Sequence, residues 1–310
     1  MVSIKPSVPE KVVRQAVQAC LGDTPFTASP LDGGLVARAF LIDAGDGRYV
    51  LRFNPDTLDA TFRKEAFIAS TFRSDLVPIP EVVAYGKLEG LQYCLTRWVR
   101  GRRLHKLTPP DLLVRFPVVA GTLLAIHAAD ISGFTGSGVM DDFGHGFHPD
   151  WPSSLLQVRD EERPDGFYGK WHSLFDTTFL RRDTFDAIFA QLESRLPYLP
   201  AERWLFHGNF GFGNVLIAGT TVTAVIDWFE SGYGDFVYDV AWLDYWDTQL
   251  EFSERLRPVY ESRGYNVENW DQRLRCYQCR IALDSMRFFA KSDDERGYDF
   301  TTRRIAALLA

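Results

Sequence analysis

The sequence predicts an α+β protein of two lobes, with a small strand-rich lobe at the N-terminus and a larger helical lobe at the C-terminus. Short apolar runs separated by turn residues dominate the first hundred positions, whereas apolar residues at helical spacing dominate most of the remainder. The length of 310 residues, about twice that of a typical domain, allows two linked units. We expect the lobes to cover residues 1–97 and 98–310, joined by a hinge near residues 96–99, with a ligand site between them.

The N-terminal lobe is expected to contain a glycine turn followed by a β-hairpin. Residues 35–53 hold two apolar runs around Asp46-Gly47, a pair typical of tight hairpin turns, and Gly33-Gly34 precede the first run. Three further elements are predicted in this order: a helix over 60–72, an extended segment over 77–86 and a strand over 91–101.

The C-terminal lobe is predicted to be mainly helical, with a loop and a hairpin between its helices. The expected elements, in chain order, are a helix over 109–129, a glycine-rich surface loop over 132–151, a helix over 177–196, a hairpin over 214–228 that turns at Gly219-Thr220, and helices from Asp235 onwards.

The composition fits a soluble globular protein and argues against several classes of partner. Hydrophobic residues make up 46% of the chain and charged residues 24%, with a net charge of -7. Nucleic-acid binding relies on clustered Lys and Arg, so none is expected, whereas an acidic surface suits a small cationic substrate. No cationic leader and no uninterrupted apolar run of ~18 residues is visible, so we expect a cytoplasmic protein with no membrane and no protein partner. Cys276 and Cys279 are expected to be buried thiols on a helix.

One stretch, "LFHGNFGFGNVL" at residues 205–216, has the pattern of a loop used in phosphoryl transfer. That reaction needs a phosphate cradle, a cationic side chain, one or two magnesium ions and a group that orients the acceptor hydroxyl. Asn214 lies in this stretch, and Asp227 ends the apolar strand that follows. A hairpin between the two would bring an amide oxygen and a carboxylate to one magnesium ion. His207 precedes Asn214 and Asp227 along the chain, which is the order that such a loop and hairpin require.

The N-terminal lobe supplies the remaining parts of such a site. Gly33 and Gly34 would let the backbone approach the phosphates, and Arg52, on the second hairpin strand, would hold phosphate oxygens. Glu65, on the next helix, would pair with Arg52. The triplet Asp142-Phe143-Gly144 resembles a kinase metal motif but precedes the loop that it should follow, so we assign it no role. Neither a G-x-x-x-x-G-K-[ST] nor a G-x-S-x-G string occurs.

The run His207-Gly208-Asn209-Phe210-Gly211-Phe212-Gly213-Asn214, followed by Ile226-Asp227-Trp228, resembles the aminoglycoside phosphotransferase family, and within it the enzymes that phosphorylate hygromycin B. The likeness spans nearly the whole chain and is strongest over residues 207–241. It implies a bilobal protein-kinase-like fold that binds ATP (or GTP) and Mg²⁺, with catalytic residues at 207 and 209. The resemblance further implies metal ligation by Asn214 and Asp227, Arg52 where most relatives use Lys, adenine against Arg97, Trp98 and Val99, and substrate against Asp244, Asp247 and Asp284.

The sequence departs from this family at Asn209, where an Asp is expected to receive the proton of the acceptor hydroxyl. Asn has nearly the same shape and accepts a hydrogen bond, but it takes no proton at neutral pH. Substrate binding should survive while turnover falls, since a general base contributes ~10²–10⁴-fold. Asn209 fits a deliberate exchange, a natural pseudokinase, or an enzyme that works with a weaker base or none.

We therefore expect an impaired phosphotransferase that moves the γ-phosphoryl group of ATP to a hydroxyl of an aminoglycoside antibiotic and confers resistance. Two alternatives stay open. One is a nucleotide-binding module that transfers no phosphate, and the other is a kinase of another small hydroxylated molecule such as choline, homoserine or a macrolide.

Overall fold

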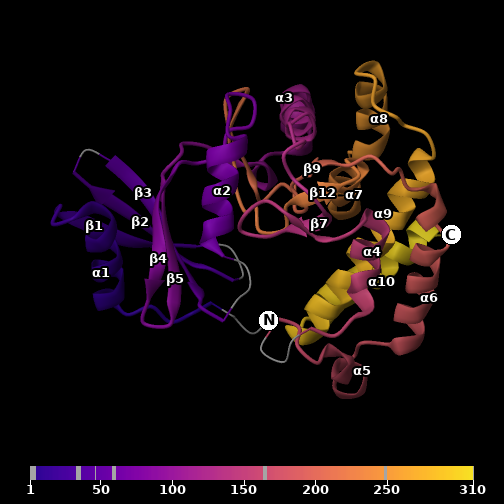
Figure 1. Cartoon of the computed structure of the whole chain (residues 1–310), viewed down its shortest axis with the longest axis horizontal. Helices are drawn as coiled ribbons and strands as arrows, with labels where there is room; N and C mark the ends of the chain where they lie inside the picture. The colour runs from indigo at the N-terminus through magenta and orange to yellow at the C-terminus, as the bar shows by residue number, and fades with distance from the viewer. Residues whose placement is uncertain are drawn as a thin grey trace.

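The computed structural model describes residues 5–32, 36–45, 47–57, 61–162, 166–247 and 250–309. An N-terminal β-sheet lies at one end of the molecule, and helices make up most of the other end (Figure 1). The α+β class predicted from the sequence is confirmed, as is the order of a strand-rich lobe followed by a helical lobe.

The N-terminal sheet is antiparallel, with the strand order β1-β2-β3-β5-β4. Its elements are α1 (Glu10–Leu21), β1 (Phe26–Leu31), β2 (Arg38–Ala44), β3 (Gly47–Pro55), β4 (Val82–Leu88) and β5 (Leu91–Arg97). Helix α1 packs on one face against β4 and β5, and its Val13 and Val17 lie in one buried cluster with Leu51 and Phe53 of β3. Side chains alternate along a strand, so Arg52 lies on the opposite face. The predicted hairpin is therefore confirmed, but the sequence analysis missed α1.

Helix α2 (Phe62–Phe72) begins at Thr61, whose hydroxyl accepts a hydrogen bond from the Lys64 backbone N–H. The buried face of α2, which includes Ile68 and Phe72, belongs to the large core of the C-terminal lobe and not to the core beneath the sheet. In Figure 1 this helix lies between the sheet and the C-terminal lobe. The division of the chain into lobes at residues 97 and 98 stays a prediction. Helix α2 precedes that boundary in the sequence, but its buried face completes the core of the larger lobe.

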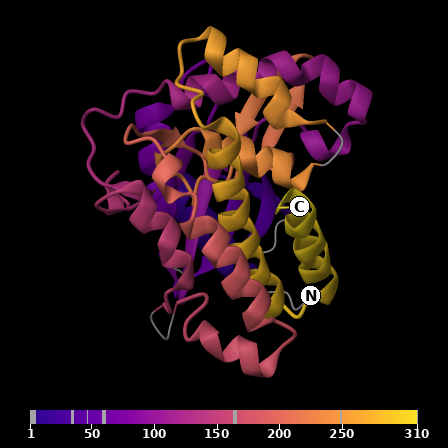
Figure 2. The same cartoon turned by 90° about the vertical axis from the view of Figure 1, so that its right-hand side faces the viewer.

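The C-terminal lobe is organised around α9 (Trp270–Lys291), which contacts α6, α7 and α10; Figure 2 shows α9 as the long helix through the middle of this lobe. Its other helices are α3 (Pro109–His127), α4 (Trp151–Leu156), α5 (Leu174–Thr177), α6 (Arg182–Glu193), α7 (Val237–Trp246), α8 (Phe252–Ser262) and α10 (Glu295–Leu309). Cys276 and Cys279 are buried in α9, as predicted. The predicted helix over 177–196 is shorter, because residues 178–181 are not helical.

Two small sheets connect these helices to the loops of the lobe. One has the order β11-β10-β6, and the other has the order β8-β7-β12-β9. Their strands are β6 (Arg102–Arg103), β7 (Ser137–Met140), β8 (Gly146–His148), β9 (Trp204–Phe206), β10 (Val215–Ala218), β11 (Thr221–Val225) and β12 (Gly232–Gly234). The β10–β11 hairpin turns at Gly219, as predicted, with Gly219 at φ +61°.

The prediction of a surface loop over 132–151 is wrong in part, because β7 and β8 lie within it. Its glycines allow strands to approach closely: a Cβ on Gly146 of β8 would lie 2.4 Å from the backbone nitrogen of Ser137 in β7. Glycine in this segment therefore reflects close backbone packing and not only a turn.

Within the described residues, α3 alone is long and apolar enough to cross a membrane by length and composition, with a mean hydropathy of 1.4. In this helix 33% of the apolar window is buried, and Leu123 and Ile126 are completely buried in the large core.

Candidate functional site

The loop after β9 is anchored to a buried carboxylate on α7. Strand β9 ends at Phe206, and the backbone N–H groups of His207 and Gly208 donate to the two oxygens of Asp239, each at 2.8 Å. His127 Nε2 donates to the same carboxylate at 3.1 Å, and the Tyr260 hydroxyl lies 2.6 Å from His127 Nδ1. All three side chains are buried. Charge-assisted hydrogen bonds of this kind fix the start of the loop.

The His207 side chain braces the loop from within. Its Nδ1 accepts a hydrogen bond from the Asn209 backbone N–H at 3.2 Å, so Nε2 carries the proton and donates to the Ile226 oxygen at 3.1 Å. Burial lowers the pKa of His207 to about 4, against the opposing effect of Asp239, so the ring is neutral. His207 was predicted as a catalytic residue, but its complete burial favours a positioning role.

Asn214 and Asp227 lie at the open end of the β10–β11 hairpin. The Ile226 N–H donates to the Asn214 oxygen at 2.9 Å, directly beyond the Val215–Val225 pair of the ladder. Asn214 Nδ2 donates to the Asn209 oxygen at 3.0 Å, which leaves its Oδ1 as the free acceptor.

Asp227 has the features of a metal ligand. Its φ of +70° is left-handed, a conformation that costs free energy in a non-glycine residue and often marks a functional position. No hydrogen bond or ion pair to its carboxylate occurs within the described part of the chain. Burial, together with Glu65, raises the pKa of Asp227 to about 6, although Arg52 and Arg103 act in the opposite direction.

The donor set fits Mg²⁺ bound together with a nucleotide. Asp227 supplies a carboxylate and Asn214 an amide oxygen, and Mg²⁺ commonly takes few protein ligands and completes its shell with water and phosphate oxygens. The described residues contain no cluster of three or more His, Cys, Asp or Glu side chains that could enclose a metal by themselves.

Arg52 and Glu65 form the ion pair predicted from the sequence. Arg52 Nη1 donates to Glu65 at 2.9 Å, and Nη2 donates to the other carboxylate oxygen. The guanidinium also lies over the Phe62 ring, 5.2 Å from its centroid. Burial acts to lower the pKa of Arg52, but Glu65, Cys94 and Asp227 raise it above its ordinary value. Arg52 therefore interacts electrostatically with Asp227, the proposed metal ligand.

The predicted hinge residues leave β5 with their side chains exposed or half-exposed. The Arg97 N–H donates to Glu81 at 2.9 Å and the Trp98 N–H donates to Arg48 at 3.0 Å, so both are used in the sheet. Val99 follows them, and its N–H makes no hydrogen bond within the described residues. Of the three, Val99 is therefore the one whose N–H is free for a nucleobase. Gly33 and Gly34 lie outside the described residues, so their role stays a prediction.

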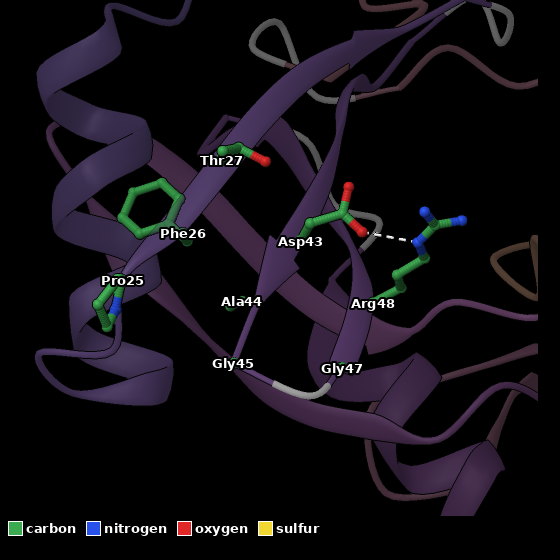
Figure 3. Close-up of a pocket in the computed structure, with 8 residues that line it drawn as sticks. All are labelled: Pro25, Phe26, Thr27, Asp43, Ala44, Gly45, Gly47 and Arg48. Carbon is green, nitrogen blue, oxygen red and sulfur yellow. Dashed lines mark hydrogen bonds and ion pairs between the residues drawn. The ribbon is translucent and has the colours of Figure 1, made fainter.

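A pocket of about 480 Å³ lies at the ends of β1, β2 and β3 (Figure 3). Arg48 Nε donates to Asp43 at 2.6 Å across its lining, and the Arg48 guanidinium lies 5.6 Å from the centroid of the Trp98 ring. Arg48 is four residues from Arg52 along the strand, so the two share a face. The pocket therefore lies at the hinge end of the sheet, with Arg48 in its lining on the face that carries Arg52.

The three acidic residues predicted to bind substrate are not equivalent. Asp244 is buried and its carboxylate accepts from Ser253 and Gln278, and its predicted substrate role stays a prediction. Asp247 accepts from the Leu250 N–H at 2.9 Å and, like Asp244, lines a pocket of about 250 Å³. Asp284, on α9, pairs with Arg280 at 3.6 Å and Arg287 at 2.5 Å. The sequence showed three acids on two helices, but not the hydrogen bonds and arginines that occupy them.

Two residues that the sequence analysis missed border the loop. Lys64, on α2, is buried, and its Nζ donates to the Phe229 oxygen at 2.6 Å and the Ser231 oxygen at 2.9 Å. Glu230, between those two carbonyls, is exposed and makes no hydrogen bond or ion pair within the described residues. It interacts electrostatically with Asp284 and Lys64. The sequence signal that could have identified Glu230 was its position, three residues after Asp227 in a glycine-containing turn.

Comparisons with known proteins identify the family. Residues 27–274 match the phosphotransferase enzyme family. The chain is 34% identical over 261 residues to hygromycin-B 4-O-kinase of Escherichia coli, which covers 83% of this chain and 72% of that protein. A thermostable mutant of aminoglycoside phosphotransferase APH(4)-Ia, crystallised in a ternary complex with ADP and hygromycin B, has a TM-score of 0.79 and 30% identity over 96% of this chain and 98% of that one.

Spectinomycin phosphotransferase APH(9)-Ia is only 12% identical, with a TM-score of 0.63 over 98% of this chain and 99% of that one, and shows the fold alone. These matches establish that the chain has the kinase-like fold, which includes the sheet, loop and hairpin described above. The chain therefore belongs to the phosphotransferase enzyme family.

Proposed function

We propose that this protein transfers the γ-phosphoryl group of ATP to a hydroxyl of an aminoglycoside antibiotic of the hygromycin B type, and thereby confers resistance. The observation that carries the proposal is the convergence of three parts: the anchored loop 207–214, the half-buried Asp227 without a protein partner, and the Arg52–Glu65 pair that interacts with it. The likeness to a hygromycin-B kinase supports the choice of substrate.

Each residue of the site would have a separate role in phosphoryl transfer. Arg52, held by Glu65, would contact phosphate oxygens, and the Val99 backbone would contact the base of ATP or GTP. Asn214 and Asp227 would hold Mg²⁺, which neutralises charge on the phosphates when bound. His207 and Asp239 keep the loop in place while the acceptor hydroxyl lies against Asn209.

The charges near the loop suit a cationic acceptor. Glu230 is exposed beside the loop, and the whole chain has a net charge of -7. Amino groups on a sugar would be attracted to this region before reaction. A small diffusible substrate requires neither a nucleic acid nor a protein partner, and we propose a cytoplasmic location, where ATP is present.

Asn209 should make turnover slower than in a relative with Asp at this position, because the amide accepts a hydrogen bond but takes no proton. The test is phosphate transfer from Mg-ATP to hygromycin B, kanamycin, a macrolide, choline and homoserine, with the native chain and Asn209→Asp. We expect transfer to hygromycin B and a kcat about 10-fold or more higher for Asn209→Asp.

Two outcomes of this experiment would reject the proposal. If Asn209→Asp binds Mg-ATP but phosphorylates none of the five compounds, the antibiotic assignment is wrong. If nucleotide binds equally with and without magnesium and neither form transfers phosphate, the chain is a nucleotide-binding module, one of the alternatives that Asn209 leaves open.

A further inference from the structure

We propose that Glu230 accepts the proton of the acceptor hydroxyl, the role that Asn209 cannot perform. This inference rests on the proposed function and assigns a catalytic residue that the family pattern of the loop does not contain.

The backbone of Glu230 lies directly against the catalytic loop. Gly208 has a φ of +81°, and a Cβ added to it would lie 2.3 Å from the Glu230 oxygen and 2.9 Å from the Glu230 Cβ. Asn209 is the next residue along the loop, so Glu230 begins beside the position where the acceptor hydroxyl is expected. Its side chain is exposed and has no hydrogen-bond or ion-pair partner within the described residues, which leaves the carboxylate available to a substrate.

Lys64 holds the backbone on both sides of Glu230. Its ammonium donates to the carbonyl oxygens on either side of Glu230, and only 4% of Lys64 is exposed. Phe62 of the same helix contacts Phe229, with ring centroids 5.8 Å apart. The backbone that carries Glu230 is therefore fixed by α2, and its side chain can reach only what its own rotamers allow.

The charges around Glu230 have both signs. Lys64 and Arg280 favour the ionised carboxylate, whereas Asp284 and Asp227 oppose it. Desolvation by the surrounding protein, followed by the charge of Asp284, raises the pKa of Glu230, and the solvent contact of its exposed side chain weakens this shift. A carboxylate of raised pKa is a stronger base than an ordinary one and is still ionised when its pKa lies below the working pH.

The chemical step balances without any further reactant. The acceptor O–H bond breaks and its proton passes to a Glu230 carboxylate oxygen, while the hydroxyl oxygen forms a bond to the γ-phosphorus. The bond between that phosphorus and the β–γ bridging oxygen breaks, and ADP leaves with the electron pair. Glu230 then releases the proton to water.

The test is a double-mutant cycle with Glu230→Gln and Asn209→Asp, assayed with Mg-ATP and hygromycin B. In the native background we expect Glu230→Gln to lower kcat about 10²-fold with little change in KM for the acceptor. In the Asn209→Asp background the same change should cost only a few-fold, because Asp at 209 then takes the proton. Glu230→Asp should retain part of the native activity and alter the acidic limb of the pH–rate profile.

Glu261→Gln, an exposed change on α8, is the matched control and should leave kcat unchanged. Equal losses from Glu230→Gln in both backgrounds, or a rise in acceptor KM alone, would show a binding role and overturn the inference. If Asn209→Asp transfers phosphate while the native chain does not, the inference fails and the proposed function stands. If no form phosphorylates any acceptor, both fall.

Discussion

Replacement of Asp239 by Asn should remove hydrogen bonds that hold the catalytic loop, while the side-chain volume stays almost unchanged. The Asp239 carboxylate is completely buried and accepts three hydrogen bonds, two from the backbone of residues 207 and 208 and one from His127. An Asn amide has one oxygen acceptor, and its nitrogen would face an N–H donor. At least one backbone N–H would therefore lose its partner inside the protein.

The expected cost follows from these contacts. A hydrogen bond to a charged group contributes about 1.5–3 kcal/mol, and a buried unpaired N–H costs about 1–3 kcal/mol. The two together predict a loss of about 3–5 kcal/mol in the free energy of unfolding. At roughly 1.5–2 °C per kcal/mol for a chain of 310 residues, the thermal midpoint should fall by about 5–10 °C.

The assay is thermal unfolding followed by circular dichroism, with kcat measured in parallel below the transition. Asp271→Asn is the control, because Asp271 is 75% exposed and its nearest cation is 4.0 Å away, so its change should stay within about 0.5 kcal/mol. Equal midpoints for Asp239→Asn and Asp271→Asn would refute the role assigned to Asp239.

Three further changes test other parts of the site. Lys64→Met leaves the Phe229 carbonyl without its side-chain donor and removes one of the two donors to the Ser231 carbonyl, so it should lower the thermal midpoint and reduce native kcat as Glu230 loses its position. Arg52→Lys loses the two-pronged contact with Glu65 and should raise KM for ATP about 10-fold in initial-rate assays; an unchanged KM would contradict the proposed phosphate contact. Since the pKa of Asp227 is about 6, the ionised form that binds magnesium dominates above that pH and is lost below it. Calorimetric titration should show Mg-ATP affinity falling about 10-fold per pH unit below pH 6, with magnesium-free ATP much less affected, and a flat profile would argue against Asp227 as a ligand.

Local patterns in the sequence were sufficient to predict several elements of the fold and of the site. Apolar alternation around a glycine turn predicts the β10–β11 hairpin, because both signals lie within about a dozen residues. The same holds for α2 and for the pairing of Arg52 with Glu65, which only requires a strand residue and a helix residue from adjacent elements. The placement of Asn214 and Asp227 at one end of the hairpin also follows from this local geometry.

Tertiary packing decided the features that the sequence did not reveal. Helix α2 reads as part of the N-terminal lobe, but Ile68 and Phe72 complete the larger core. Asp244 was expected to face the substrate, but Ser253 and Gln278 donate hydrogen bonds to its carboxylate in the interior. The contact between Lys64 and the carbonyl beyond Glu230 joins residues 167 positions apart, a distance over which no local pattern extends.

The contacts of Asn209 explain how a catalytic charge can be absent from an otherwise complete loop. Its backbone N–H donates to His207 and its backbone oxygen accepts from Asn214, and any residue except proline can make both contacts. By contrast, Asp235 pairs with Arg273 inside the protein, where removal of one charge leaves the other buried and unpaired. The fold therefore depends on the carboxylates at 235 and 239 but not on one at 209. A change at 209 alters the reaction without altering the scaffold, and a carboxylate on a neighbouring turn, such as Glu230, can then take the proton from the same hydroxyl.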